Sequence, residues 1–233
     1  MKIIGHRGAR GLKTENTLAS LLTASKLNID AIELDIRVTK DRHLVICHNE
    51  SLKDVYGLDK NISDLTLDEI QKIRTPSGDP ILTLQQVMSQ KFDKPLILDI
   101  KREGTADLLY NELGDKQQNH WLVNSLFPEE LKRLKQLYPQ LEMSLQTYKH
   151  PFRTIKTAKK IGASSVTLVL YLLNPLTYWR ARKQNLRVWT YQNYASFLLT
   201  WPWLVKLLLA VYPSLTIVTD RPDKMASLKN KFF

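Results

Sequence analysis

Two carboxylates stand two residues apart inside an apolar stretch of this chain, AIELDIRV at 31–38. Residues two apart in a β-strand point to the same face, so Glu33 and Asp35 share one side of the strand and isoleucine and leucine fill the other. A second apolar stretch, LILDIK at 96–101, repeats the arrangement with Asp99 and Lys101. A buried charge without a partner is costly. The spacing therefore predicts a charged cluster at the ends of two strands.

The three acids of this cluster offer only oxygen atoms as ligands. Such a set suits a hard divalent cation, Mg²⁺ or Ca²⁺ with Mn²⁺ as a further candidate, and the lack of a Cys/His cluster argues against structural zinc. The structural alternative is a buried ion-pair network. We predict that Glu33, Asp35 and Asp99 hold the metal.

Two histidines and an arginine stand at other strand ends. His6 and Arg7 lie between glycines in GHRG at 5–8, a tight turn after an apolar run, and His48 ends the run HLVICH. Two histidines can serve as base and acid near neutral pH, while Arg7 and Lys101 are natural partners of a phosphate. The alternative for GHRG is a basic loop. Together with a metal, the set predicts cleavage of a phosphodiester.

These residues need a scaffold that gathers strand ends, and the chain alternates apolar runs with amphipathic, helix-like stretches. The alternation is typical of parallel strands joined by helices. The link of 38–42 is too short for a parallel crossover, so HLVICH must return antiparallel and belong to an insertion that ends near Pro80. The other runs predict a (β/α)8 barrel of the TIM type. The strands are expected at 2–5, 31–38, 95–101, 121–125, 141–146, 164–170, 186–192 and 215–220, and the helices are expected to begin near Asn16, Thr66, Thr83, Thr105, Pro128, Phe152, Leu176 and Tyr194.

Composition restricts the class of protein. The chain has 233 residues, of which 43% are hydrophobic and 24% charged, and this excludes disorder and coiled coils. Its net charge is +11, but the basic residues are dispersed at helix-like spacing and predict no nucleic-acid partner. One cysteine, Cys47 in an apolar run, indicates a reducing compartment and a small buried side chain. With an apolar run directly after Lys2, we expect a cytoplasmic protein, with a place at the inner membrane surface as an alternative.

Six segments in order resemble the glycerophosphodiester phosphodiesterases: GHRGARGLKTENT, AIELDIRVTKD, VICHNESL, LDIK, VWTYQN and VTDRPD. The resemblance runs from Ile3 to Asp223 and implies one barrel domain over 1–233, with an insertion at about 38–80. It implies a metal-dependent hydrolase that releases glycerol 3-phosphate and an alcohol. It also implies that His6 and His48 are the catalytic pair, that Arg7 and Lys101 bind the phosphate, and that the three acids hold the metal.

Several positions depart from the family pattern. Asp99 replaces the usual Glu, Asn49 the usual Asp, Thr14 the usual Pro and Gln192 the usual Asn. Three further residues lie in the matched segments. Glu15 is expected at the mouth of the site, Asn16 is expected to cap a helix, and Trp189 lines the substrate pocket or packs in the core. Asp220 is expected to begin the last helix, and His43, His120 and His150 to lie on the surface.

The apolar stretch at 195–215 raises the question of a membrane. Lys206 and Pro202 interrupt it, and a spanning segment here would prevent the barrel from closing. The remaining alternatives are an interfacial element, with Trp201, Trp203 and Tyr212 at the headgroups, and a helix packed on the barrel. Two further functions stay open: a phospholipase-D-like hydrolase of lysophospholipids, and a catalytically weak barrel that docks on membranes.

Overall fold

A closed barrel of parallel strands forms the centre of the protein. The computed structural model describes residues 1–114, 121–191 and 202–232. In this part of the chain β1 pairs with both β9 and β2, which closes a ring of eight parallel strands. The predicted TIM-type barrel is confirmed. The barrel strands are β1 (Lys2–Gly5), β2 (Ala31–Val38), β4 (Leu96–Ile100), β5 (Trp121–Ser125), β6 (Met143–Thr147), β7 (Ser165–Val169), β8 (Arg187–Tyr191) and β9 (Thr216–Thr219).

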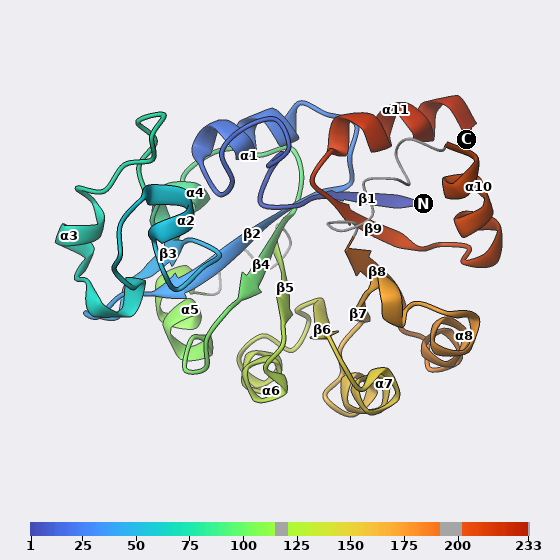
Figure 1. Ribbon diagram of the computed structural model, residues 1–233. Helices are drawn as coiled ribbons and strands as arrows, with labels where there is room; N and C mark the ends of the chain where they lie inside the picture. The colour runs from blue at the N-terminus through green and yellow to red at the C-terminus, as the bar shows by residue number, and fades with distance from the viewer. Residues whose placement is uncertain (115–120, 192–201, 233) are drawn as a thin grey trace.

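The ninth strand of the sheet, β3 (Leu44–Ile46), runs antiparallel to β2, with Ile36 opposite Ile46. This confirms the return predicted from the short link before it. The segment that follows forms a small lobe beside the barrel, with α2 (Lys53–Tyr56), η1 (Ile62–Asp64), α3 (Leu67–Ile70) and α4 (Leu84–Met88) (Figure 1). A separate apolar cluster stabilises the lobe; it includes Val45, Cys47, Leu52, Tyr56, Ile62, Leu65, Ile70 and Ile81. The buried place expected for Cys47 is confirmed.

Helices cover the outside of the barrel (Figure 1). Five of them begin with proline, which lacks the N–H that a first turn leaves unpaired. The helix expected near Tyr194 lies outside the described residues. The outer helices are α1 (Leu18–Ser25), α5 (Ala106–Leu113), α6 (Pro128–Leu137), α7 (Pro151–Lys160), α8 (Pro175–Lys183), α10 (Pro202–Val211) and α11 (Pro222–Phe232), with a short helix η2 at Leu170–Leu172.

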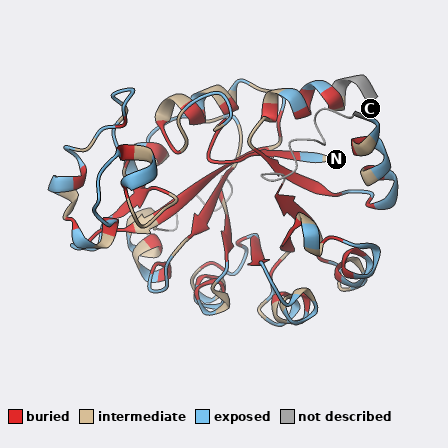
Figure 2. Cartoon of the chain, in the orientation of Figure 1, coloured by how far each residue is buried: buried red, intermediate tan, exposed pale blue. Residues whose placement is uncertain are grey.

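The strands are buried on both faces (Figure 2). Their outward side chains pack against the helices in one large apolar cluster, which includes Leu34, Leu98 and Val166. Their inward side chains form a second cluster inside the barrel, with Ile4, Ala31, Ile97, Trp189 and Val218. Because strand side chains alternate, the residues two steps further along these strands point inward as well. Those residues are His6, Glu33, Asp99, Tyr191 and Asp220, so an apolar layer supports a polar one at the carboxyl ends of the strands.

The apolar stretch near the C-terminus is partly described. Pro202, which was expected to interrupt a helix, is the first residue of α10. Trp203 is exposed. Tyr212 is buried, and its ring lies 5.2 Å from that of Tyr178, so the expected place of Tyr212 at lipid headgroups is wrong. Trp201 lies outside the described residues. None of the described helices has the length and apolar character needed to cross a membrane.

Candidate active site

Three buried carboxylates converge at the carboxyl ends of β2 and β4. The two strands pair with Asp35 directly opposite Asp99, and Glu33 lies two residues before Asp35 on the same face. One oxygen of each acid lies within 4.8 Å of the others, and all three side chains are buried. Among the described residues this is the one group of acids, histidines and cysteines close enough to hold a metal ion.

Lys101 joins two of these acids. Its Nζ atom lies 2.6 Å from Oδ2 of Asp99 and 2.9 Å from Oδ1 of Asp35. Burial acts to lower the pKa of Lys101, but the two carboxylates outweigh it and raise the pKa above its usual value. The ammonium is therefore charged at neutral pH and places one fixed positive charge in the cluster.

Arg7 adds a second positive charge from the turn after β1. Its backbone has a positive φ of 51°, an uncommon conformation for a residue other than glycine, and its N–H donates to Oε2 of Glu33 over 2.7 Å. The guanidinium lies 2.7 Å from Oε1 of Glu15 and 3.3 Å from Oδ2 of Asp35. The next residue, Gly8, has a φ of 82°, and a Cβ there would lie 2.5 Å from Oγ of Ser20. The GHRG turn is thus shaped to aim Arg7 at the acids.

His6 has a carboxylate partner that the sequence did not indicate. Its Nδ1 lies 2.5 Å from Oδ1 of Asp220, which comes directly after β9. Asp220 is expected from the sequence to begin the last helix; it lies two residues before α11 and also holds His6. Burial lowers the pKa of His6, and the hydrogen bond with Asp220 opposes this change. The neutral ring then carries its proton on Nδ1 and leaves Nε2 as an acceptor.

His48 is held by the residue that follows it. Its Nδ1 lies 2.6 Å from Oδ1 of Asn49, and Nδ2 of Asn49 donates to Asp54 over 2.9 Å. The amide oxygen accepts from Nδ1, so Asn49 orients the ring as an acid would but without its charge. Burial lowers the pKa of His48 to about 4, although Asp35 lies near enough to oppose the change. His48 is therefore neutral at pH 7.

A chain of polar side chains inside the barrel leads away from Asp99. Tyr191 donates its hydroxyl toward Oδ2 of Asp99 at 3.4 Å, and its ring meets that of His6 edge to face at 5.2 Å. Asn124 donates to the Tyr191 hydroxyl at 3.3 Å and to Oε1 of Gln146 at 2.7 Å. Sequence reasoning missed these residues because one polar group in an apolar strand carries little signal. The inward parity that they share with Glu33 and Asp99 could have indicated them.

Three further expectations about the site can be compared with the structure. Asn16 does not cap a helix: Thr17 caps α1 by accepting from the N–H of Ser20, and Asn16 donates instead to Oδ2 of Asp35 at 2.8 Å. Glu15 lies at the site and binds Arg7. Trp189 is buried in the apolar cluster inside the barrel, one layer below Tyr191.

The remaining histidines lie apart from this cluster. His43 and His150 are exposed, as expected for surface residues. His120 lies outside the described residues, as does Gln192.

The acid cluster fits a cation. Burial and the charge of Asp35 raise the pKa of Glu33 well above its usual value, and burial raises that of Asp99 as well. Burial acts to raise the pKa of Asp35 too, but Lys101 and Arg7 hold it below its usual value. Oε1 of Glu33 is buried and has no hydrogen-bond partner among the described residues. With all three acids ionised, the cluster would carry more negative charge than Arg7 and Lys101 balance, and Oε1 of Glu33 is left for a ligand.

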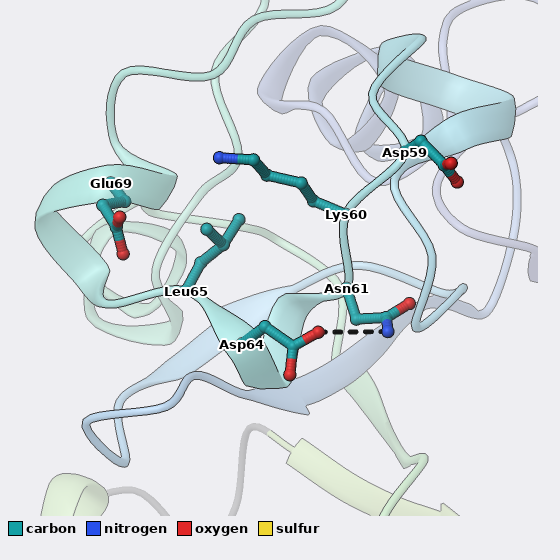
Figure 3. Close-up of a pocket in the computed structure, with 6 residues that line it drawn as sticks. All are labelled: Asp59, Lys60, Asn61, Asp64, Leu65 and Glu69. Carbon is teal, nitrogen blue, oxygen red and sulfur yellow. Dashed lines mark hydrogen bonds between the residues drawn. The ribbon is translucent and has the colours of Figure 1, made fainter.

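Another acidic group lies on the lobe, around a surface hollow of about 380 Å³ (Figure 3). Its carboxylates come from Asp59, Asp64 and Glu69, with Lys60 among them. Figure 3 shows that Asp64 is turned toward Asn61, to which it is hydrogen-bonded, and that Asp59 and Glu69 lie on opposite sides of the hollow. These acids do not converge as those of the barrel do.

The barrel site combines a cation-binding acid cluster, two fixed positive charges and two neutral histidines at the carboxyl ends of parallel strands. This is where barrel enzymes carry out their chemistry, and the donor set is that of a phosphoryl-transfer or phosphodiester-cleaving hydrolase. A sequence profile described as the glycerophosphoryl diester phosphodiesterase family matches residues 6–224. The chain belongs to this family, and it is an enzyme that hydrolyses glycerophosphodiesters.

Individual relatives agree with this assignment. YhdW of Bacillus subtilis is 29% identical over 211 residues, which are 83% of this chain and 87% of the relative. Human lysophospholipase D GDPD1 is 45% identical over 69 residues, 30% of this chain and 22% of the relative. A phosphodiesterase of Oleispira antarctica, solved with the product sn-glycerol-3-phosphate, has 21% identity and superposes with a TM-score of 0.84 over 99% of this chain and 97% of that chain. The last comparison bears on the fold.

Proposed function

We propose that the protein hydrolyses glycerophosphodiesters with the help of a divalent cation held by Glu33, Asp35 and Asp99. The observation that carries the proposal is the convergence of these three buried oxygen donors, one of them unpartnered. Mg²⁺ and Ca²⁺ are the first candidates and Mn²⁺ the next, because the ligands are all hard oxygens. When bound, such an ion supplies positive charge to the phosphate and to the oxygen that attacks it.

Arg7 and Lys101 have the charge that a phosphate needs. Both lie beside the acid cluster, where low exposure makes their charges more effective than in water. In the proposed reaction they contact the non-bridging oxygens of the substrate and hold the phosphorus in front of the two histidines. Arg7 supplies a planar fork of donors and Lys101 a point charge.

The two histidines divide the proton transfers. The histidine that acts as the acid must carry a second ring proton when the alcohol departs. The Asp220 carboxylate stabilises that form of His6, whose ring is neutral without substrate. His48 has only the neutral amide of Asn49 and a pKa near 4. We therefore assign His48 as the base that takes a proton from the attacking water. His6 is the acid that gives a proton to the oxygen of the departing alcohol as its bond to phosphorus breaks, which leaves glycerol 3-phosphate.

Two classes of substrate are candidates, one soluble and one a lipid. A soluble glycerophosphodiester such as glycerophosphocholine is the first candidate. A lysophospholipid is the second, because a human relative that is 45% identical over 69 residues is named lysophospholipase D. Glu15, which binds Arg7, and Trp189 remain proposed components of the substrate pocket. Contact of 195–215 with a membrane also remains a proposal, supported by the exposed Trp203.

We propose that the chain forms one domain over 1–233, with the lobe of about 38–80 as an insertion. The antiparallel pairing of β3 with β2 supports this, because it makes the lobe part of the same sheet. A cytoplasmic site of action and the absence of a nucleic-acid partner stay predictions, based on the single buried Cys47 and on the dispersed basic residues.

Product analysis tests the proposal. Glycerophosphocholine and lysophosphatidylcholine are offered separately, with excess chelator and after Mg²⁺, Ca²⁺ or Mn²⁺ is restored. We expect release of choline and a phosphomonoester, abolished by chelation and by Asp35→Asn. Asp59→Asn removes the same charge from the hollow on the lobe and should keep full activity. Full turnover after verified metal removal contradicts the role of the cation.

A further inference from the structure

Exposed apolar side chains gather on one side of the barrel mouth. Phe152, Tyr171 and Leu176 are 45%, 74% and 65% exposed, and Tyr148 beside them is 44% exposed. We call these four residues the apolar rim. Scattered exposed apolar residues need no explanation, but a group in adjacent loops marks an interaction surface.

The chain places the apolar rim on the same end of the barrel as the acid cluster. Tyr148 directly follows β6, and Tyr171 lies in η2, directly after the neighbouring strand β7. Phe152 and Leu176 are the second residues of α7 and α8, the helices that follow these two strands. The Tyr171 hydroxyl donates to the backbone oxygen of Tyr148 over 2.5 Å, which ties the two loops together.

The apolar rim also reaches the interior of the site. Nε2 of Gln146 donates to the Tyr148 hydroxyl at 2.7 Å, and Gln146 belongs to the polar chain that ends at Asp99. Burial raises the pKa of Tyr148, and Lys101 and Asp99 are near enough to act on it. A molecule seated on the apolar rim would therefore lie beside the mouth through which a phosphodiester must enter.

The charge of the same loops is one-sided. The segments 148–153 and 170–176 contain Lys149 and Arg153 and no acidic residue. Both cations are exposed and, within the described chain, form no ion pair with an acid. Some basic residues elsewhere are paired with acids, for example Arg133 with Asp107 and Lys229 with Asp30. The surface is thus apolar and basic together, which complements a layer of anionic headgroups over hydrocarbon.

We infer that the apolar rim, with Lys149 and Arg153, docks the mouth of the barrel on an anionic phospholipid surface. A second copy of this chain is a poorer occupant, because a two-fold contact would bring each basic pair against its own equivalent. A lipid surface offers both apolar depth and negative charge. Docking would bring an amphiphilic phosphodiester to Arg7 and Lys101. This benefit rests on the proposed function, whereas the docking itself does not.

Sedimentation with vesicles tests the docking directly. The full chain is mixed with vesicles of phosphatidylcholine alone or with phosphatidylglycerol added, and bound protein is measured. We expect binding only where phosphatidylglycerol is present. Phe152→Ser with Leu176→Ser, and separately Lys149→Gln with Arg153→Gln, should each weaken binding about tenfold or more.

Matched controls carry the same changes elsewhere. Leu22→Ser with Leu58→Ser removes exposed apolar side chains from α1 and from the lobe, outside the apolar rim. Lys159→Gln with Lys160→Gln removes two charges at the opposite end of α7. Both controls should bind as the unchanged protein does. Every variant is also assayed on soluble glycerophosphocholine, where we expect full activity, which shows that the fold is intact.

The results separate docking from catalysis. Binding that is lost in the rim variants and kept in the controls supports the inference, even if no substrate is turned over. An active protein that ignores anionic vesicles overturns the inference and leaves the proposed function standing. Equal loss in the rim and control variants overturns it too. So does a concentration-dependent dimer that Phe152→Ser with Leu176→Ser abolishes, because the apolar rim would then be an interface between copies.

Discussion

His6 and His48 differ in the group that each holds at Nδ1. A carboxylate, Asp220, stands beside His6, whereas an amide, Asn49, stands beside His48. A carboxylate stabilises an imidazolium, and an amide oxygen does so much less. The difference suits His6 to donate a proton and His48 to accept one at the same phosphate. It also makes the division of work testable by changing the substrate.

Substrates with a weakly basic leaving group should bypass the acid but not the base. On glycerophosphocholine, His6→Ala and His48→Ala should each lower kcat by about 10²-fold or more. With the p-nitrophenyl ester of glycerol phosphate, the leaving nitrophenolate needs no proton. On this substrate kcat of His6→Ala should return most of the way to that of the unchanged protein, and kcat of His48→Ala should stay low. Absorbance of released nitrophenolate measures both rates. Asp220→Asn should resemble His6→Ala in a milder form.

His43→Ala is the matched control for these variants, because His43 is exposed and lies on the lobe beside Asp41. It should leave both rates unchanged. Recovery by His48→Ala instead of His6→Ala would reverse the assignment of acid and base. The double variant should lose much less than the product of the two single losses, since the histidines act on one reaction.

Sequence reasoning found the residues of this site that carry their own signal. Glu33, Asp35, Asp99 and Lys101 stand out because charges inside apolar strands are rare and share one parity. Asp220 did not stand out, because its partner is 214 residues away in the chain and only closure of the barrel brings them together. Long-range partners of this kind depend on the tertiary fold.

At the scale of the elements, the start of α1 shows how local rules fail next to a site. Asn16 and Thr17 are both good N-cap residues, and the sequence alone favoured the first. The structure uses Thr17, with its hydroxyl 3.2 Å from the N–H of Ser20. Asn16 takes a positive φ of 57° and exchanges two hydrogen bonds with Asp35, because that buried acid needs a donor. Asn16 therefore provides hydrogen bonds to the buried Asp35 carboxylate instead of capping α1.

Two substitutions at this turn should separate stability from activity. Thr17→Ala removes the cap and should lower the free energy of unfolding by about 1 kcal/mol with little effect on turnover. Asn16→Gly removes the amide but tolerates the positive φ, and it should lower kcat/KM about tenfold or more because Asp35 loses its orienting partner. Urea unfolding and steady-state rates measure the two effects. Equal losses of activity in both variants would contradict this division.

The strands and the antiparallel β3 were predictable because apolar run length and link length are local properties. The closure of the barrel followed from counting these runs. Helix starts were expected within one or two residues of α3, α4, α6 and α7. The place of Tyr212 was not predictable, because its contact with Tyr178 of α8 depends on how two helices pack.

At the scale of the whole molecule, the acid cluster opposes folding until something balances it. Closure of the barrel buries three acids from β2 and β4, and among the described residues the cations paired with them are Arg7 and Lys101. Burial of like charges is costly, so the fold without a metal is less stable than its apolar core alone would make it. Metal binding and global stability are therefore linked.

Adding Mg²⁺, Ca²⁺ or Mn²⁺ should consequently raise the melting temperature. At a metal concentration about 100 times the dissociation constant, a ligand of the native state adds about 2.7 kcal/mol, which corresponds to a rise of about 5–10 °C for a chain of this size. Scanning calorimetry after chelation and dialysis measures the shift. Asp35→Asn should abolish it, and Asp59→Asn, an equal loss of charge in the exposed hollow of the lobe, should keep it. A shift that persists in Asp35→Asn and disappears in Asp59→Asn would move the metal from the barrel to the lobe, because stabilisation must follow the residues that bind the ion.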